Sequence, residues 1–366
     1  MRKQHQKTYE LLGMFDQFIL ESTKGKRQQK NGNRLRPGTV QNYVYTRKIL
    51  EEFSAVKKFT LRIRDTRKLT ARELESERGY WKKFYRKFTE FLYQQKGFYD
   101  NYAGFHFKTI RSFFNYLNDE KGMSVGSYHK LFYVPKETVP IITLSPEQLQ
   151  FLTYDENFEK GLSASLQRVK DILVIGCTVA LRVSDLLNLR KINLEKQGER
   201  FYLRVQSQKT NTFTRVMLPD YALKIFRKYS NRHTTLLPPI TNAHLNRRLK
   251  ELVEKAGWKE PVLKTRERRG NTIHLFRNRK SRQAYRFCDM ITSHTMRRTA
   301  ITTMLSLGMP EQLVRKISGH APHSKEFFRY VEIAQNYLDR ETEKLHLRLQ
   351  KVPATSVDLL PKEQVI

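Results

Sequence analysis

The chain has 366 residues, enough for two ordinary domains that each bury a core of their own. Hydrophobic residues make up 39% of it and charged residues 29%, which is typical of a globular protein. Lys and Arg number 69 against 36 Asp and Glu, so the net charge is +33, and the excess runs along the whole chain. This charge predicts a nucleic-acid partner; a ribosomal-type basic protein and a generally over-charged surface are the alternatives.

Cysteine usage and hydropathy exclude several classes of protein. Cys177 and Cys288 lie far apart and form no CxxC pair, which argues against a disulfide framework or a cysteine-based zinc site. The N-terminus opens on charge with no apolar segment behind it, and no apolar run approaches about 18 residues. We therefore expect neither secretion nor a membrane span, and a reducing cytoplasm fits.

Four helices are expected in the first part of the chain. Apolar residues recur at helical spacing from Tyr9 to Ile19, a polar loop covers Gly25 to Asn33, and Pro37 stands where a helix commonly begins. Two aromatic-rich helices follow, roughly Tyr80–Gln95 and Tyr99–Asp119. For the charged face of this all-α domain we weigh DNA contact against an ordinary solvated helix face at Arg34, Arg36, Arg47, Lys48, Lys108 and Arg111.

A linker separates this domain from the next. The stretch from Tyr133 to Ser145 carries Pro135 and Pro140 without helical periodicity, so we place the boundary near Val139. The expected division is 1–138, 139–350 and a tail over 351–366. After the linker, Ser145-Pro146-Glu147-Gln148 predicts a capped helix start.

The second domain is expected to be helical with one small antiparallel sheet. Asp171–Ala180 is almost continuously apolar and predicts a buried helix. Phe201–Val205 and Phe213–Leu218 are rich in strand formers and predict a hairpin with Lys209 near its tip. Lys264–Arg286 reads as a very basic loop region.

Helices are expected again from Ser293 to the end of the fold. Pro310 would open a helix at Glu311–Ile317, and a last helical segment would run from about Ala334 to Leu349.

Residues suited to phosphodiester chemistry recur through this second domain. Arg182 directly follows the buried helix, so it either meets a ligand or pairs with an acid such as Asp185. Arginine suits a pentacovalent phosphate because its guanidinium donates two parallel hydrogen bonds and stays ionised. Lys209 is by default a solvated lysine, but at a hairpin tip it could protonate a leaving oxygen.

His294 and Arg297 are three residues apart and would share one helix face. Ser293 is a candidate N-cap, which would place His294 at a helix start that favours an anion. Arg298 could contact either a phosphate or an acidic residue. A His-x-x-Arg pair is by itself a weak signal in so basic a chain.

The last candidates lie near the end of the fold. Gly319 fits a C-terminal turn with positive φ, and His320 would project from that turn, with His323 as a competitor for its role. Tyr330 could act as a nucleophile if cations surround it, although an ordinary core tyrosine is the usual interpretation of a single tyrosine.

Taken in order, Arg182, Lys209, His294-x-x-Arg297, Gly319-His320 and Tyr330 resemble the catalytic signature of the tyrosine recombinase (phage integrase) family. The resemblance covers about Thr143 to Leu349, and the preceding helices look like the core-binding domain of that family. It implies a mostly α fold with a small antiparallel β-sheet: an N-terminal helical, SAM-like core-binding domain and a C-terminal α+β catalytic domain.

The resemblance also implies a role for each residue. Arg182 and Arg297 would clamp the scissile phosphate with His320, and Lys209 would protonate the leaving 5′-hydroxyl. His294 would handle the proton of the nucleophile Tyr330, which would form a 3′-phosphotyrosyl link without metal or ATP, so no cofactor is expected.

The expected partners are double-stranded DNA, further copies of the chain in a tetramer on two DNA sites, and DNA-bending or directionality factors. The expected location is the cytoplasm, at the nucleoid. Two features depart from the family pattern: ten residues separate His320 from Tyr330 where nine are usual, and Arg298 replaces a common histidine.

The resemblance leaves the biological role open. Integration or excision of a mobile element or phage is the first hypothesis. A Xer-like resolvase or invertase, a type IB topoisomerase-like enzyme and a catalytically inactive DNA-binding relative are the alternatives.

Overall fold

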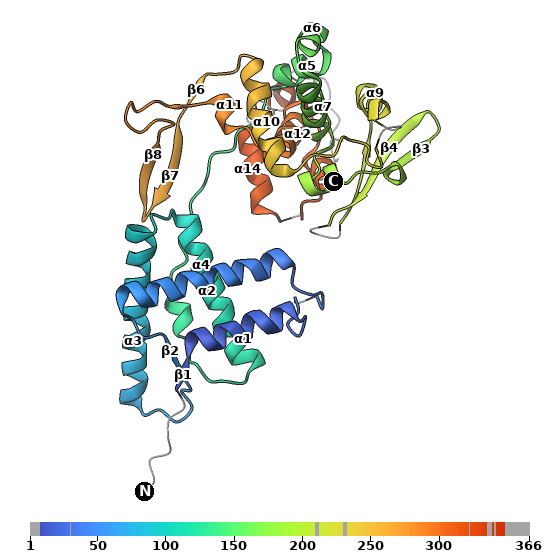
Figure 1. Ribbon diagram of the computed structural model, residues 1–366. Helices are drawn as coiled ribbons and strands as arrows, with labels where there is room; N and C mark the ends of the chain where they lie inside the picture. The colour runs from blue at the N-terminus through green and yellow to red at the C-terminus, as the bar shows by residue number, and fades with distance from the viewer. Residues whose placement is uncertain are drawn as a thin grey trace, which may run out of the picture. The chain divides into compact units, whose positions relative to one another are not determined.

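The computed structural model describes residues 8–29, 31–208, 212–229, 233–321, 323–334, 339 and 342–347. The chain divides into two compact units (Figure 1). The first holds the described residues up to Val139 together with Lys264–Leu275. The second holds Pro140–Leu263 and the described residues from Phe276 onward. Within these described parts, every helix is too short or too polar to cross a bilayer.

The first unit is built from four long helices, which confirms the predicted helical character of this region. Short π-helical turns continue two of the helices, a 3-10 turn follows, and two strand pairs complete the unit. The elements are β1 (Thr8–Glu10), α1 (Leu11–Thr23), α2 (Pro37–Lys57), β2 (Arg62–Arg64), α3 (Ala71–Glu90), η1 (Phe91–Gln95), α4 (Asp100–Asn115), η2 (Tyr116–Glu120), η3 (Tyr128–Leu131), β7 (Lys264–Arg268) and β8 (Asn271–Leu275).

Aromatic side chains form most of the core of this unit. Trp81 on α3 packs edge-on against Phe84 and Phe114, with ring centroids 5.4 and 4.9 Å apart. Phe53 makes further edge-on contacts with Phe84 and Phe88. Such contacts each add about 0.5–1.5 kcal/mol to the burial of the rings.

Helix α3 begins nine residues earlier than the sequence predicts. The predicted start was Tyr80, because the residues before it are mostly charged and carry no apolar period. In the structure Thr70 and Glu73 form a capping box that starts the helix. Glu77 is almost fully buried, where it accepts hydrogen bonds from Arg62 and from the indole of Trp81. The first turns of α3 are therefore stabilised by a capping box and by a buried, hydrogen-bonded glutamate, and not by a periodic apolar face.

The segment Lys264–Leu275 is a hairpin, not the loop that the sequence predicted. Strands β7 and β8 pair in register from Lys264↔Leu275 to Arg268↔Asn271. The hairpin packs with the first unit, where Arg266 donates two hydrogen bonds to the buried carboxylate of Glu137, at 3.0 and 2.5 Å. The sequence missed the hairpin because β7 is almost entirely charged and carries no alternation of apolar residues, and both strands are partly or fully exposed.

The second unit is also mainly helical and carries a three-stranded antiparallel sheet of order β3-β4-β5. A short strand pair, β6 with β9, lies between its helices in sequence. The elements are α5 (Pro146–Tyr154), α6 (Glu156–Lys160), α7 (Ala164–Val179), α8 (Val183–Leu187), η4 (Lys191–Asn193), β3 (Leu194–Gln197), β4 (Arg200–Gln206), β5 (Phe213–Met217), α9 (Asp220–Tyr229), α10 (Asn242–Lys255), β6 (Pro261–Val262), β9 (Tyr285–Arg286), α11 (Phe287–Met290), α12 (Ser293–Ser306), α13 (Glu311–Ser318) and α14 (Lys325–Ile333).

Several sequence predictions are confirmed in this unit. Ser145 and Gln148 form the predicted capping box at the start of α5. The β4–β5 pairing confirms the predicted hairpin, although β3 was missed. Helix α12 begins at Ser293 with Thr292 as its N-cap, so the prediction that Ser293 caps it is wrong. Half of the predicted last segment, 334–349, lies outside the described residues, and its described part at 342–347 is helical.

Helices α7 and α12 pack closely at the centre of the second unit. Gly176 on α7 makes this approach possible, because an added Cβ would lie 2.7 Å from the sulfur of Met296 and 3.1 Å from Leu186. Eleven residues of α7 are buried, which confirms the predicted buried helix. This contact brings the end of α7 next to the middle of α12, where the candidate residues lie.

Candidate active site

The end of α7 positions the first arginine. Ala180 takes a left-handed conformation with φ of 55°, so the chain turns sharply before Arg182, which is the N-cap of α8. Arg182 donates from Nη1 to Ser207 Oγ at 2.8 Å, and Ser207 in turn donates to Asp185 Oδ2 at 3.0 Å. The acid that the sequence suggested as a partner therefore reaches Arg182 through a serine of the β4–β5 loop.

The second arginine is held by backbone carbonyls. Arg297 on α12 is 8% exposed and donates from Nη1 to Ala180 O and from Nη2 to Ser318 O, at 2.8 and 2.7 Å. The two carbonyls belong to the residues that end α7 and α13. A helix leaves its last carbonyls without internal partners, so a buried guanidinium is well matched to this position.

His320 follows α13 and lies against Arg297. Gly319 has a φ of 63° and ends the helix, as the sequence predicts. The ring of His320 then lies 3.4 Å from Arg297 Nη2 and 2.8 Å, through Nδ1, from Ser318 Oγ. An added Cβ on Gly319 would meet Thr212 Oγ1 at 3.0 Å, so this turn also abuts the base of the β4–β5 hairpin.

Tyr330 lies on α14 beside the histidine. Its ring centroid is 5.9 Å from that of His320 and 6.2 Å from that of Phe327. Tyr330 is half-buried and packs at the border of a small apolar cluster that includes Ala180 and Ala300. Tyr330 is thus neither a fully buried core tyrosine nor a solvated one. Its ring packs against the apolar cluster and also lies close to His320.

Arg182, Arg297, His320 and Tyr330 therefore come together, although two helices, α12 and α14, and the turns that follow α7 and α13 supply them. Burial, followed by the repulsion of the Arg182 cation, lowers the pKa of Arg297 to about 10. Burial, followed by the cations Arg297, Arg182 and Arg315, lowers the pKa of His320 to about 3. Positive charge is concentrated here without a full complement of acids, which is the environment that a bound phosphate would neutralise.

The remaining candidates are less closely tied to this cluster. His294 lies in the first turn of α12 and is exposed, whereas Arg297 one turn later is buried. Arg298 is partly exposed and His323 is exposed. His320, not His323, is the histidine against Arg297. Lys209 lies outside the described residues.

Two serines of this cluster were missed by sequence reasoning. Ser207 joins Arg182 to Asp185, and Ser318 holds the ring of His320 while its carbonyl holds Arg297. Serines carry little sequence signal by themselves. Their positions beside other candidate residues could have indicated them. Ser318 directly precedes Gly319-His320, and Ser207 begins the loop that leads to Lys209.

The candidate DNA-contacting residues of the first unit fall into two groups. Arg47 is paired with Asp16 on α1 and with Glu51 one turn further along α2, and Arg111 donates to the carbonyls of His129 and Lys130 at 3.0 and 3.1 Å. These two guanidinium groups therefore have structural partners. The other cations are exposed: Arg34, Arg36, Lys48 and Lys108.

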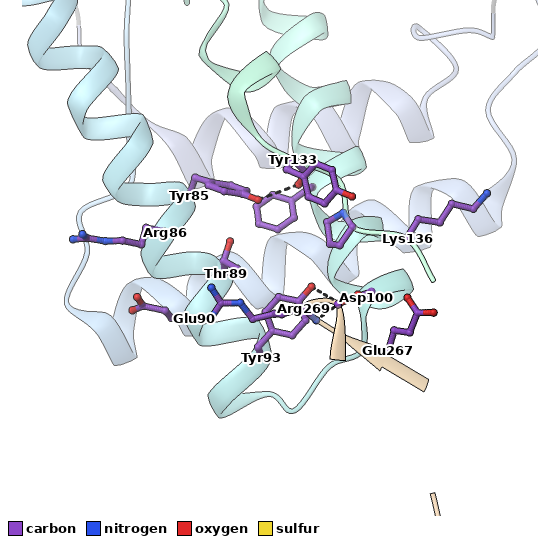
Figure 2. Close-up of a pocket in the computed structure, with 13 residues that line it drawn as sticks. Tyr85, Arg86, Thr89, Glu90, Tyr93, Asp100, Tyr133, Lys136, Glu267 and Arg269 are labelled. Carbon is purple, nitrogen blue, oxygen red and sulfur yellow. Dashed lines mark hydrogen bonds between the residues drawn. The ribbon is translucent and has the colours of Figure 1, made fainter. Parts of the chain in front are cut away.

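A cavity of about 480 Å³ lies in the first unit, and none of the residues of the cluster lines it (Figure 2). Helix α3, the Tyr133–Lys136 segment and the turn of the β7–β8 hairpin line it. Asp100 is buried there, where its Oδ1 accepts from Tyr93 Oη and from the backbone N–H of Arg269, at 2.6 and 2.9 Å. The lining mixes acids with bases, and among its groups the Tyr93 hydroxyl and the backbone N–H of Arg269 both donate to Asp100.

The protein-family model described as "Phage integrase family" matches residues 147–336, more than half of the chain. The chain belongs to the phage integrase family. This family member is a tyrosine-type site-specific recombinase, and the matched range contains every residue of the cluster. None of the curated proteins compared with the recombinase matches it.

Solved structures of similar fold include the XerH site-specific recombinase bound to palindromic difH substrate, in a post-cleavage complex. It is 13% identical, with a TM-score of 0.56 over 93% of this chain and 95% of that one. The Tn1549 transposon integrase in complex with transposon right end DNA is 13% identical, with a TM-score of 0.55 over 92% and 100% of the two chains.

A lambda integrase dimer bound to a COC′ core site is 12% identical, with a TM-score of 0.52 over 88% of the recombinase and 77% of that chain. These likenesses extend over both units. They confirm the predicted fold, a helical N-terminal domain followed by a catalytic domain with small antiparallel sheets.

Proposed function

We propose that the recombinase integrates and excises a mobile element or phage genome through a 3′-phosphotyrosyl intermediate. Arg182 and Arg297 bind the non-bridging oxygens of the scissile phosphate, and His320 donates a further hydrogen bond to them. Tyr330 attacks the phosphorus and displaces the 5′-oxygen, which takes a proton from Lys209. His294 handles the proton of Tyr330. The energy of the broken bond is kept in the ester, so rejoining needs no separate energy source.

One observation carries this proposal: His320 lies close to both Arg297 and Tyr330. The Nδ1 atom of the histidine is 3.4 Å from the guanidinium Nη2, and its ring centroid is 5.9 Å from that of the tyrosine. A phosphate held by the arginine is therefore within reach of the phenol. Preorganised donors around a developing charge commonly supply the largest share of such a rate enhancement.

The proposed assembly is a tetramer on two duplexes that exchanges strands in pairs through a Holliday junction, in the cytoplasm at the nucleoid. Accessory DNA-bending or directionality factors would select between integration and excision. In this proposal the N-terminal unit contacts DNA through Arg34, Arg36, Lys48 and Lys108, and the catalytic unit through Arg298. Arg47 pairs with two carboxylates and Arg111 with two backbone carbonyls, so both also hold neighbouring segments in place.

A nicked suicide duplex that carries the native crossover site tests the chemistry. Incubated in EDTA, the wild-type protein is expected to form a covalent adduct through Tyr330, and Tyr330→Phe is expected to form none. Tyr154→Phe removes a hydroxyl from a tyrosine that is 64% exposed in the same unit and serves as the control. A wild-type protein that binds this duplex but forms no adduct would identify an inactive relative instead.

The fold of XerH gives a second candidate role, dimer resolution or inversion by the same chemistry. The two roles differ in the arrangement of the sites they join. A plasmid assay with sites in direct and in inverted orientation distinguishes them, and relaxation of supercoils by a monomer without site preference would identify type IB topoisomerase activity.

A further inference from the structure

The segment between β8 and β9 forms an ordered basic turn that the proposed chemistry does not use. Asn278 and Gln283 pair as an antiparallel bridge, with hydrogen bonds from Arg277 N to Gln283 O at 2.8 Å and from Gln283 N to Asn278 O at 3.1 Å. Asn278 Oδ1 also accepts from the backbone N–H groups of Lys280 and Ser281. The turn is therefore closed by its own backbone and by one asparagine, without support from its cationic side chains.

Cations at the base of this turn are paired with acids. Arg286 donates two hydrogen bonds to Asp289 and is also paired with Glu254. Arg277 lies 3.6 Å from the same Asp289. These pairs anchor the base of the turn to α10 and α11, because Glu254 and Asp289 belong to those helices.

Cations at the tip of the turn have no such partners. Arg279, Lys280 and Arg282 are all exposed, and none has a carboxylate partner within the described part of the chain. The sequence from Phe276 to Tyr285 contains no acidic residue at all. Arg282 also takes a left-handed conformation, with a φ of 50°.

This arrangement costs folding free energy. A non-glycine residue in the left-handed region costs about 1 kcal/mol or more, and three cations within four residues repel one another. The acids at the base, Asp289 and Glu254, already pair with Arg277 and Arg286. An anion supplied from outside would relieve the repulsion, which is the physical signature of a binding surface for polyanions.

We propose that this turn, residues 278–283, is a contact for the DNA sugar-phosphate backbone. Arg279, Lys280 and Arg282 bind phosphate oxygens, and the rigid base keeps them at a fixed position on the catalytic unit. The inference rests on the proposed DNA-recombining function and adds a contact outside the tyrosine cluster. A duplex fits better than an acidic protein surface because a strand presents several phosphates within a short length, and the turn presents three cations within four residues.

Salt dependence of binding provides the first test. Arg279→Gln, Lys280→Gln and Arg282→Asn are combined, and affinity for a mixed-sequence duplex of about 40 base pairs is measured between about 0.05 and 0.2 M KCl. Each phosphate contact contributes about 0.9 to the slope of log affinity against log salt, so the loss of three contacts should lower the magnitude of the slope by about 2.7 and lower affinity at about 0.15 M by roughly tenfold or more.

The matched control removes the same charge from an exposed face of α3, with Arg72→Gln, Lys82→Gln and Lys83→Gln. Equal losses for the two triple variants would show a general effect of net charge and overturn the proposal. If the wild type binds the duplex and the turn variant shows the same salt slope, the proposal is also overturned. If the wild type itself fails to bind the duplex, the proposed function fails first. Lost self-association with unchanged DNA affinity would assign the turn to a protein contact.

A tethered cleavage reagent provides a second test that does not depend on affinity. Both native cysteines are buried, so Ser281→Cys offers one accessible thiol at the tip for an iron chelate. We expect this derivative to cut a bound duplex at discrete backbone positions. Ser76→Cys on α3 serves as the matched position. Equal cutting from both positions, or none from position 281, would overturn the proposal.

Discussion

Arg297 donates a hydrogen bond from Nη1 to the carbonyl of Ala180 at 2.8 Å. Ala180 is the left-handed residue that ends α7, two residues before Arg182. The turn at Ala180 therefore positions both arginines. Its carbonyl accepts a hydrogen bond from Arg297, and its left-handed backbone sets the direction in which the chain continues to Arg182.

Replacement of Arg297 by lysine is expected to slow formation of the covalent adduct. An ammonium group cannot reproduce the planar fork that reaches both Ala180 O and Ser318 O and still faces a phosphate. Loss of one preorganised donor costs roughly 10²–10³ in rate, so we expect a decrease of that order in single-turnover adduct formation at saturating DNA. Lys224→Gln, an exposed cation on α9, is the control. An unchanged rate for Arg297→Lys would contradict the assignment.

Replacement of Gly176 by alanine is expected to destabilise the protein and to slow the reaction. The added Cβ would lie 2.7 Å from the sulfur and 2.9 Å from the Cβ of Met296, which forces α7 and α12 apart. Overpacking of this kind costs about 1–3 kcal/mol in the free energy of unfolding, measurable by urea denaturation.

The same displacement moves Ala180 O away from Arg297, so adduct formation should slow as well. Shortening the opposing side chain with Met296→Ala in the Gly176→Ala background should restore part of both losses. Additive losses in the double variant would show that the two residues do not share this contact.

Replacement of His106 by phenylalanine is expected to reduce the sensitivity of stability to acid. His106 is fully buried, its Nε2 has no hydrogen-bond partner in the described chain, and burial lowers its pKa to about 3. Between pH 6.5 and that value the unfolded chain binds a proton that the folded chain does not, so stability falls as the pH falls. The loss reaches about 2 kcal/mol at pH 5 for one such histidine.

In His106→Phe this loss should disappear, and the ring cage of Tyr45, Phe98 and Tyr102 should accept the new side chain. Unfolding free energies of the variant and the wild type, measured from pH 8 to pH 5, test this. His244→Gln, at an exposed histidine, is the control. Parallel curves for His106→Phe and the wild type would contradict the prediction.

Replacement of Glu137 by glutamine is expected to release the β7–β8 hairpin. Glu137 is buried and accepts hydrogen bonds from Arg266 and from the backbone N–H of Glu267, the latter at 2.7 Å. Burial raises the pKa of Glu137, but these hydrogen bonds and the Arg266 charge outweigh it, so the net pKa is lowered. The stabilisation is therefore present above the normal pKa of a glutamate and is lost as the pH falls through the lowered value.

Glutamine keeps the shape of the glutamate side chain but loses its charge, and its amide NH₂ group donates hydrogen bonds where a carboxylate oxygen accepted them. We expect a loss of about 1–3 kcal/mol in the free energy of unfolding and faster hydrogen exchange over Lys264–Leu275. Glu75→Gln, on the exposed face of α3, should change neither. Unchanged exchange in the hairpin of Glu137→Gln would contradict this role.

Much of the fold follows from local sequence signals. Proline and hydroxyl caps predicted the starts of α2 and α5, a continuous apolar run predicted α7, and alternating strand formers predicted the β4–β5 hairpin. The early start of α3 and the β7–β8 hairpin were missed. Both depend on buried charge pairs, Glu77 with Arg62 and Glu137 with Arg266, whose partners lie 15 and 129 residues away in sequence.

The sequence by itself determined which residues could carry out the chemistry, because arginines, a histidine and a tyrosine recur in a family-specific order. Only the tertiary structure decided which of them meet. Arg182 and Arg297 are brought together because Gly176 lets α7 and α12 touch, and His320 reaches them because Ser318 and Gly319 end α13 beside the same turn. Such contacts depend on the shapes of distant helices, which no local pattern of residues contains.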